Sequence, residues 1–267
     1  MLIDTLSKAQ QAVLLASILA DGEITKCYPK SRRKNNSYRE WKQRQLTEIL
    51  YIRQNNLVSK SLPLMTELYP YFYPNHKKMI PFELLSRCAH PLFILTLYLD
   101  DGSLMISKRT NKSNQLYATP SIALYLQSFS KEELTHFCNW LNQTFHLNFR
   151  LSRTPNGCGY FLKTTRVADT LAFLKQVASY TVDLPKFAYK LDWESRLNQL
   201  QHDHPQYQII TSKPSRPYTS EEYTTILELK ANGWTTQAIA EKLNRTYWFV
   251  TYKFGQLKKA MEQVHDL

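Results

Sequence analysis

Two aspartates occupy equivalent places in this sequence, each at the end of an apolar stretch and directly before a glycine. Asp21 follows LASILA and Asp101 follows LTLYLD, eighty residues further along. A lone Asp-Gly is most often an ordinary helix end with a surface carboxylate. However, the helix dipole disfavours an anion at a helix C-terminus, and a divalent cation would compensate it. Two such carboxylates brought together repel each other unless metal ions lie between them, and Mg²⁺ prefers oxygen ligands of this kind. The pair therefore indicates metal-assisted hydrolysis.

The elements that must position these acids are two buried helices. Residues 12–20 are apolar almost all round, as are residues 92–99, which is typical of helices that are covered on every side. Gly22 is a natural end for the first helix, because glycine tolerates the left-handed cap conformation. The small side chains of Ala16, Ser17 and Ala20 would let a second helix approach closely. We therefore expect a pseudo-symmetric molecule in which the paired helices bring Asp21 and Asp101 together.

Basic residues are concentrated after each motif. Between residues 26 and 44 there is one acid, Glu40, and the basic residues are Lys26, Lys30, Arg32, Arg33, Lys34, Arg39, Lys42 and Arg44; the second motif is followed by Lys108, Arg109 and Lys112. Asparagines and aromatic residues lie among them, a mixture that suits phosphate contacts and hydrogen bonds to base edges. The alternative is a solvated, mobile loop. The position directly after a motif favours nucleic-acid contact.

Composition narrows the class of protein. The chain has 267 residues, 34 Lys+Arg against 22 Asp+Glu, a net charge of +12 and 43% hydrophobic residues, which excludes wholesale disorder. No apolar run reaches the roughly 18 residues of a membrane-spanning helix, and the four cysteines have no C-x-x-C spacing. We therefore expect an intracellular protein without a zinc site or disulfides. The basic excess indicates a polyanionic partner, but charge alone does not separate an enzyme acting on DNA from a passive binder.

With these motifs in place, the sequence resembles the LAGLIDADG homing endonucleases of the single-chain, two-repeat type. The resemblance runs from about Val13 to Asp192 and includes residues 71–103, 127–149 and 187–192. It implies an α/β fold of two pseudo-symmetric αββαββ-type repeats, residues 1–80 and 81–203, which form a DNA-binding saddle. It also implies a monomeric, site-specific endonuclease that cuts double-stranded DNA with Mg²⁺, with Mn²⁺ as a substitute, and leaves short 3′ overhangs.

The same resemblance implies roles for individual residues. Asp21 and Asp101 stand at the positions of the metal ligands, and Ala20 and Asp100 would offer backbone carbonyls to the metal. Lys78 and Lys190 stand where the family has its catalytic lysines, which would stabilise charge on the scissile phosphate. Lys77 is a rival for Lys78, and an ordinary surface lysine is the alternative at both positions.

The first motif departs from the family signature, with Ser17 and Leu19 where the family has an apolar residue and an acid. Two other functions therefore stay open: an RNA maturase that assists intron splicing, and a transcription regulator that binds DNA without cutting it. The intact acids and lysines favour the enzyme, because a pure binder has no need of paired carboxylates beside DNA phosphates.

The pattern in the last third of the sequence predicts a separate helical module. A helix to about Leu200 precedes a polar, proline-bearing linker over residues 204–217, in which His204, like His202 before it, is expected to be solvent-exposed rather than a metal ligand. Residues 218–267 then show three helices with Thr219, Thr236 and Thr246 as caps, and this pattern resembles a helix-turn-helix or Myb-like unit. In that interpretation Trp234, Val250 and Phe254 form its core, and the residues that contact DNA are Arg245, Tyr247, Trp248, Tyr252 and Lys258. The alternative is a small bundle used for protein contacts.

Overall fold

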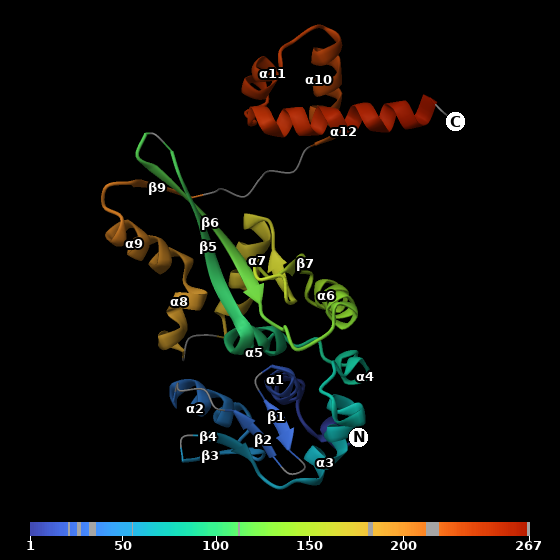
Figure 1. Ribbon diagram of the computed structural model, residues 1–267, viewed down its shortest axis with the longest axis vertical. Helices are drawn as coiled ribbons and strands as arrows, with labels where there is room; N and C mark the ends of the chain where they lie inside the picture. Colours follow the sequence, from blue (N-terminus) through green and yellow to red (C-terminus); the bar gives the residue numbers. More distant parts are fainter. Residues whose placement is uncertain are drawn as a thin grey trace. The chain divides into compact units, whose positions relative to one another are not determined.

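The computed structural model describes residues 1–20, 22–25, 28–31, 36–54, 56–111, 113–180, 184–211 and 219–265. The chain divides into two compact units, Met1–Pro214 and Ser215–Leu267 (Figure 1). None of the helices among the described residues is long and apolar enough to cross a membrane.

The first repeat begins with the predicted apolar helix. Helix α1 (Lys8–Leu19) starts at Ser7, whose side chain accepts a hydrogen bond from the backbone N–H of Gln10. Eight of its twelve residues are buried, as its continuous apolar sequence predicts. The other elements of this half are η1 (Leu2–Thr5), β1 (Glu23–Thr25), β2 (Tyr28–Ser31), α2 (Asn36–Gln45), β3 (Leu50–Arg53), β4 (Asn56–Ser59), α3 (Pro63–Phe72), η2 (Pro74–His76) and α4 (Phe82–Leu85).

The second repeat has the same order, helix–strand–strand–helix–strand–strand–helix. Its first helix, α5 (Leu92–Asp101), is buried from Leu92 to Asp100. The elements that follow are β5 (Gly102–Thr110), β6 (Gln115–Leu124), α6 (Lys131–Phe145), β7 (Phe149–Arg153), β8 (Tyr160–Thr164), α7 (Val167–Ala178), η3 (Pro185–Phe187), α8 (Ala188–Leu191), α9 (Trp193–Asp203) and β9 (Gln208–Thr211).

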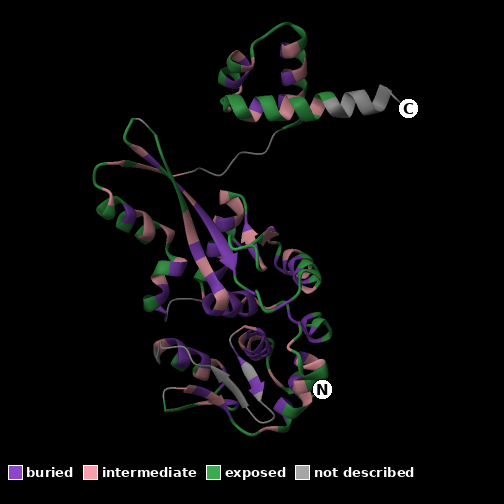
Figure 2. Cartoon of the chain, in the orientation of Figure 1, coloured by how far each residue is buried: buried purple, intermediate pink, exposed green. Residues whose placement is uncertain are grey.

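Each repeat folds its first four strands into an antiparallel sheet with the same connectivity. The strand orders are β1-β2-β4-β3 and β5-β6-β8-β7. Helices α1 and α5 pack against each other between the two sheets (Figure 1). One hydrophobic core contains residues from both repeats, including α1, α3, α5, α6 and α7, and Figure 2 shows this buried centre. The predicted α/β fold of two pseudo-symmetric repeats is confirmed.

Part of the predicted linker is instead a strand of the second sheet. Residues 208–211 form β9, which pairs in parallel with β6, Gln115 opposite Gln208 and Ala118 opposite Thr211. Helix α9 packs beside it, and Leu200, Leu197 and Ile209 form a small apolar cluster with Leu116 and Ala118. A linker over residues 204–217 is therefore wrong at its start, because alternating apolar residues in QYQII anchor the chain to the sheet.

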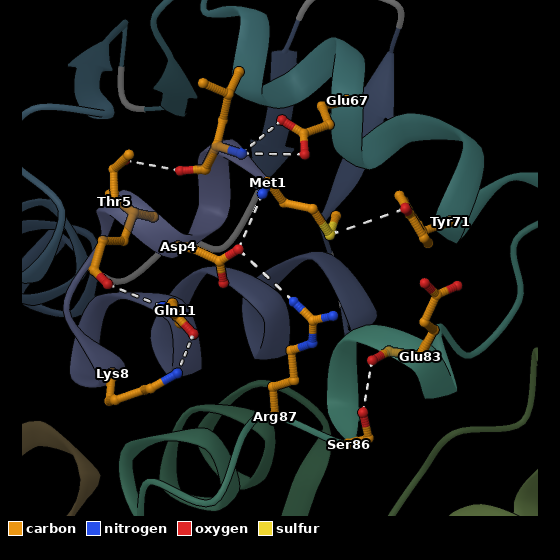
Figure 3. Close-up of polar contacts among 12 residues, drawn as sticks. Met1, Asp4, Thr5, Lys8, Gln11, Glu67, Tyr71, Glu83, Ser86 and Arg87 are labelled. Carbon is orange, nitrogen blue, oxygen red and sulfur yellow. Dashed lines mark hydrogen bonds and ion pairs between the residues drawn. The ribbon is translucent and has the colours of Figure 1, made fainter.

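The N-terminal turn is held to two later segments by polar contacts (Figure 3). The terminal ammonium of Met1 lies 3.0 Å from Asp4, whose carboxylate is 3.7 Å from the guanidinium of Arg87. The backbone N–H of Leu2 donates to Glu67 on α3 at 2.8 Å. The pKa of Asp4 is lowered, mainly because its carboxylate accepts a hydrogen bond from the terminal ammonium. These contacts attach η1 to α3 and to the segment after α4.

The described part of the second unit, residues 219–265, forms three helices, α10 (Ser220–Ala231), α11 (Thr236–Lys242) and α12 (Tyr247–His265). The predicted capping box of Thr219 and Glu222 is confirmed, and Thr246 accepts a hydrogen bond from the backbone N–H of Phe249. Helix α11 is capped by Thr235 rather than by Thr236. Ile226, Leu229, Ile239, Ala240 and Val250 form the core, with Phe254 packed against it.

Two further predictions about this unit are wrong. Trp234 is 41% exposed and is not a core residue, because it follows the turn that ends α10. Arg245 does not present its side chain to solvent. The Arg245 side chain is 6% exposed, and its guanidinium donates to the carboxylate of Glu222 at 2.7 Å. It therefore stabilises the unit from within. The exposed residues of α12 include Tyr247, Trp248, Tyr252 and Lys258.

Candidate active site

Close packing fixes the end of each motif helix. A Cβ atom at Gly22 would collide with the carbonyl of Ser17, and one at Gly102 would collide with the ring of Tyr98. The backbone N–H of Gly22 donates to the Ser17 carbonyl at 2.8 Å. Gly102 has an extended backbone, with φ −102° and ψ 165°. At Gly102 the motif thus requires glycine because of space and not because of a left-handed conformation.

The acid before Asp101 forms a buried ion pair across the two repeats. Nζ of Lys42, on α2, lies 2.6 Å from Oδ2 of Asp100 at the end of α5, and the side chains are 2% and 0% exposed. Beside this pair, Tyr38 packs its ring under the Lys42 ammonium and donates to the Thr96 carbonyl at 3.4 Å. Helix α2 of the first repeat is therefore attached to helix α5, which carries the second motif. Because Lys42 holds Oδ2 of Asp100, we expect this residue to approach a metal through its backbone carbonyl.

Lys78 contacts the end of the first motif helix directly. Its Nζ donates to the carbonyls of Ala20 at 2.7 Å and Gly22 at 2.9 Å, the residues on either side of Asp21. This places a positive charge at the negative end of the α1 dipole. Lys77, the rival candidate, is exposed.

Lys190 contacts the end of the second motif helix in the same way, but it binds carbonyls nearer the N-terminus of that helix and is more deeply buried than Lys78. Its Nζ donates to the carbonyls of Leu99 at 2.9 Å and Tyr98 at 3.4 Å, and the residue is 6% exposed. Its own carbonyl accepts a hydrogen bond from the Tyr98 hydroxyl at 2.6 Å. Burial raises the pKa of Tyr98, so this hydroxyl stays a proton donor. Lys190 and Tyr98 thus hold each other in place.

The oxygens available at the helix ends suit a hard divalent cation. Asp101 is half-buried at the end of α5, and the carbonyls of Ala20 and Asp100 precede the two acids. Lys78 occupies one lone pair of the Ala20 carbonyl, which has two. Asp21 lies outside the described residues. Among the residues that are described, no three His, Cys, Asp or Glu side chains cluster as a metal site.

The face of the second sheet away from α6 and α7 is the candidate DNA surface. Strand register places Ser103, Met105, Ser107 and Arg109 of β5 opposite Ala123, Ser121, Thr119 and Tyr117 of β6 on this face. Arg150 and Lys163, opposite each other on β7 and β8, share it through Ala123. We define these residues as the open face, within which the small side chains of Ala123 and Ser121 are buried. Sequence reasoning missed Arg150 and Lys163. On β8, however, Lys163 lies between the core residues Leu162 and Thr164, and this alternation is visible in the sequence.

Several predicted DNA contacts lie elsewhere or are not described. Lys108 belongs to the opposite face of β5 from Arg109, with its Nζ 3.3 Å from Nε2 of His204. Arg39 is buried on α2, where Tyr38 and Trp41 pack into the core, so its prediction as a DNA contact is wrong. Lys30 pairs with Val58 through the backbone of β2, and its side chain is outside the described atoms. The predicted contacts outside the described residues are Lys26, Arg32, Arg33, Lys34 and Lys112.

Comparison with known proteins agrees with this geometry. The sequence profile of the LAGLIDADG DNA endonuclease family matches residues 12–168. The chain is 26% identical over 213 residues to "Probable intron-encoded endonuclease 1" of Wickerhamomyces canadensis, covering 70% of this chain and 85% of that protein. It is 25% identical over 204 residues to "Protein RecA" of Mycobacterium shimoidei, covering 70% of this chain and 47% of that protein.

Among solved structures, the homing endonuclease I-WcaI bound to its DNA recognition sequence is similar, with a TM-score of 0.56 and 26% identity, over 70% of this chain and 87% of that chain. The family profile spans more than half of the sequence, and it includes both Asp-Gly motifs and the strands that follow them. The chain therefore belongs to the LAGLIDADG DNA endonuclease family.

Proposed function

We propose that this protein is a site-specific endonuclease that hydrolyses one phosphodiester bond on each strand of double-stranded DNA. The observation that carries the proposal is that a lysine from the end of each repeat donates to carbonyls at the C-terminal end of one motif helix. Each ammonium also stabilises the helix end that it caps, so the proposal rests on the combination of a lysine with an Asp-Gly at both helix ends and not on the caps alone. Phosphate oxygens approaching these ends would meet positive charge.

In this proposal Asp21 and Asp101 would hold divalent cations, Mg²⁺ by preference, together with the carbonyls of Ala20 and Asp100. The cations would supply charge neutralisation at the attacking and leaving oxygens of the phosphate. Lys78 and Lys190 stabilise the charge that the phosphate gains in the transition state. For Lys190 this requires its ammonium to leave the Leu99 carbonyl, because the residue is only 6% exposed.

The two sheets would form the saddle that lies along the DNA, with the open face of the second sheet in the major groove. Arg109, Arg150 and Lys163 supply phosphate or base contacts there. The cut strands would carry short 3′ overhangs. The three-helix unit adds DNA contacts through exposed residues of α12, of which Trp248 is 77% and Tyr252 is 70% exposed. Large exposed aromatic side chains on the same helix as Lys258 suit a nucleic-acid surface.

The test is selection of cleavable sites from a randomised duplex library with Mg²⁺. Wild type should yield a defined site, and Asp101→Asn should bind that site but cut neither strand normally. Glu132→Gln, which also removes one negative charge but lies on the exposed surface of α6, is the matched control and should cut as wild type does. Normal cutting by Asp101→Asn would refute the site. Binding without any cutting by wild type would instead favour a maturase or a regulator.

A further inference from the structure

Helix α9 and strand β9 lie beyond the segment that the family profile matches, residues 12–168. Strand β9 adds a third strand to the β5–β6 ribbon at the end where β5 and β6 are joined (Figure 1). Strand β8 pairs with β6 only at Ala123 and Leu124, whereas β9 pairs with β6 at residues 115–118. Strand β9 therefore continues the sheet at the part of the ribbon that β8 does not reach.

The register assigns each residue of β9 to a face. Ile209 pairs with Leu116 and packs in the apolar cluster under α9, which fixes the alternation. Gln208 pairs with Gln115, and Ile210 pairs with Tyr117, so both belong to the open face. Tyr117 is in turn opposite Arg109 on β5. Three strands thus contribute side chains to one surface at the end of the ribbon.

The polar side chains on this surface hold one another. The Asn111 amide donates to Oε1 of Gln115 at 2.8 Å, and the Tyr117 hydroxyl donates to the same oxygen at 3.2 Å. Nε2 of Gln115 then donates to Oε1 of Gln208 at 3.4 Å. Gln208 is exposed, whereas Gln115 is half-buried. The network orients an exposed amide at the outer end of the open face.

The chemistry of this surface suits base edges in the major groove. A glutamine amide offers one acceptor and two donors, and it can bind N6 and N7 of adenine, while arginine binds O6 and N7 of guanine. Arg109 belongs to this face, and the sequence from Ser103 to Tyr125 contains no acid, so the charge of this surface is complementary to DNA phosphates. A hollow of about 770 Å³ beside Arg109, Tyr117 and Thr119 leaves room at this end of the ribbon.

We propose that β9 is a specificity strand in which Gln208, positioned by Gln115, reads base pairs at the outer end of the half-site contacted by the second repeat. This inference rests on the proposed endonuclease function. Gln208 touches the base edge, and Gln115 acts through Gln208. Ile210 lies beside Tyr117 and contributes apolar contact of the kind that a thymine methyl group accepts.

The experiment compares full-length variants by measuring cleavage of every single-base substitution of the selected target. Gln208→Ala should reduce discrimination by about tenfold at one or two adjacent outer base pairs and leave discrimination at the other positions unchanged. Gln115→Ala should affect the same base pairs to a smaller extent. Gln199→Ala, which removes the same side chain from the α9 surface, should leave the profile unchanged.

A variant that gains preference for a different base cannot owe its altered cleavage profile to misfolding. Gln208→Arg should shift the preferred base at the same position toward guanine. An unchanged profile for both Gln208 variants, or an equal loss at all positions, would overturn the inference and leave β9 as a mechanical support. If wild type cuts no duplex at all, the proposed function fails instead, so the two failures are distinguishable.

Discussion

The buried pair of Lys42 and Asp100 allows a quantitative test of how the two repeats are joined. Lys42→Met keeps most of the length of the side chain but leaves the Asp100 carboxylate without its cation at the end of α5. Removing one partner of a buried ion pair costs about 3–5 kcal/mol of stability. The Lys42–Asp100 distance of 2.6 Å and exposures of 2% and 0% put this pair in that class.

The double variant separates charge from packing. Replacing both members of a buried pair with apolar residues is often neutral or stabilising, by about 1–4 kcal/mol. Lys42→Met with Asp100→Leu should therefore recover most of the stability that Lys42→Met loses. The matched control is Lys60→Met. Its partner Glu48 is 4.0 Å away and both side chains are exposed, so the change should stay below about 1 kcal/mol.

The assay is hydrogen exchange of α1 and α5 amides over a urea series, because these buried amides report the unfolding free energy of the first unit. Peptides from α10–α12 provide an internal reference in the same sample. A cost for Lys42→Met no greater than that of Lys60→Met would refute the reasoning. A double variant as unstable as the single one would show that packing, rather than charge compensation, is what Lys42 provides.

Three further outcomes are expected. Lys78→Gln keeps a donor to the helix carbonyls but loses the charge, so it should slow cleavage far more than it weakens binding, while the exposed Lys77→Gln changes neither; equal losses of rate and affinity would make Lys78 an ordinary phosphate contact. Lys258→Gln on α12 should lower the slope of log K against log salt by about 0.9, and Lys175→Gln on the outer side of α7 should leave that slope as it is. Burial lowers the pKa of His90 from 6.5. The His90 imidazole therefore binds a proton more readily in the unfolded chain than in the folded one, so the first unit should lose stability as pH falls below 6.5. His90→Asn should make the urea midpoint of unfolding less dependent on pH in this range.

The sequence predicted the parts of the fold that depend on local pattern. The continuous apolar stretches ending in Gly22 and Gly102 became the paired helices, and the capping box at Thr219 begins α10 as expected. Lys78 and Lys190 came from the family resemblance, and the structure brings each to a motif helix. Their catalytic roles stay predictions.

Features that depend on distant partners could not be predicted in this way. Lys42 and Arg39 stood in a strongly basic run, and nothing local signals that Asp100, 58 residues away, draws Lys42 into the core. The local sequence predicts a linker at β9, because the pairing of this strand with β6 depends on residues 93 positions earlier, as in the contact between Gln115 and Gln208. The position of Arg245 near a recognition helix predicts a DNA contact, because nothing in the local pattern shows that Glu222 is its partner.

The length of the β5–β6 ribbon has a consequence for how much information one half of a target can carry. Strands β5 and β6 have 9 and 10 residues. A strand advances about 3.3 Å per residue, close to the 3.4 Å rise of a base pair. The ribbon can therefore follow one half of a target at close to one base pair per residue, and sequence variation in the half that faces the second repeat should be poorly tolerated.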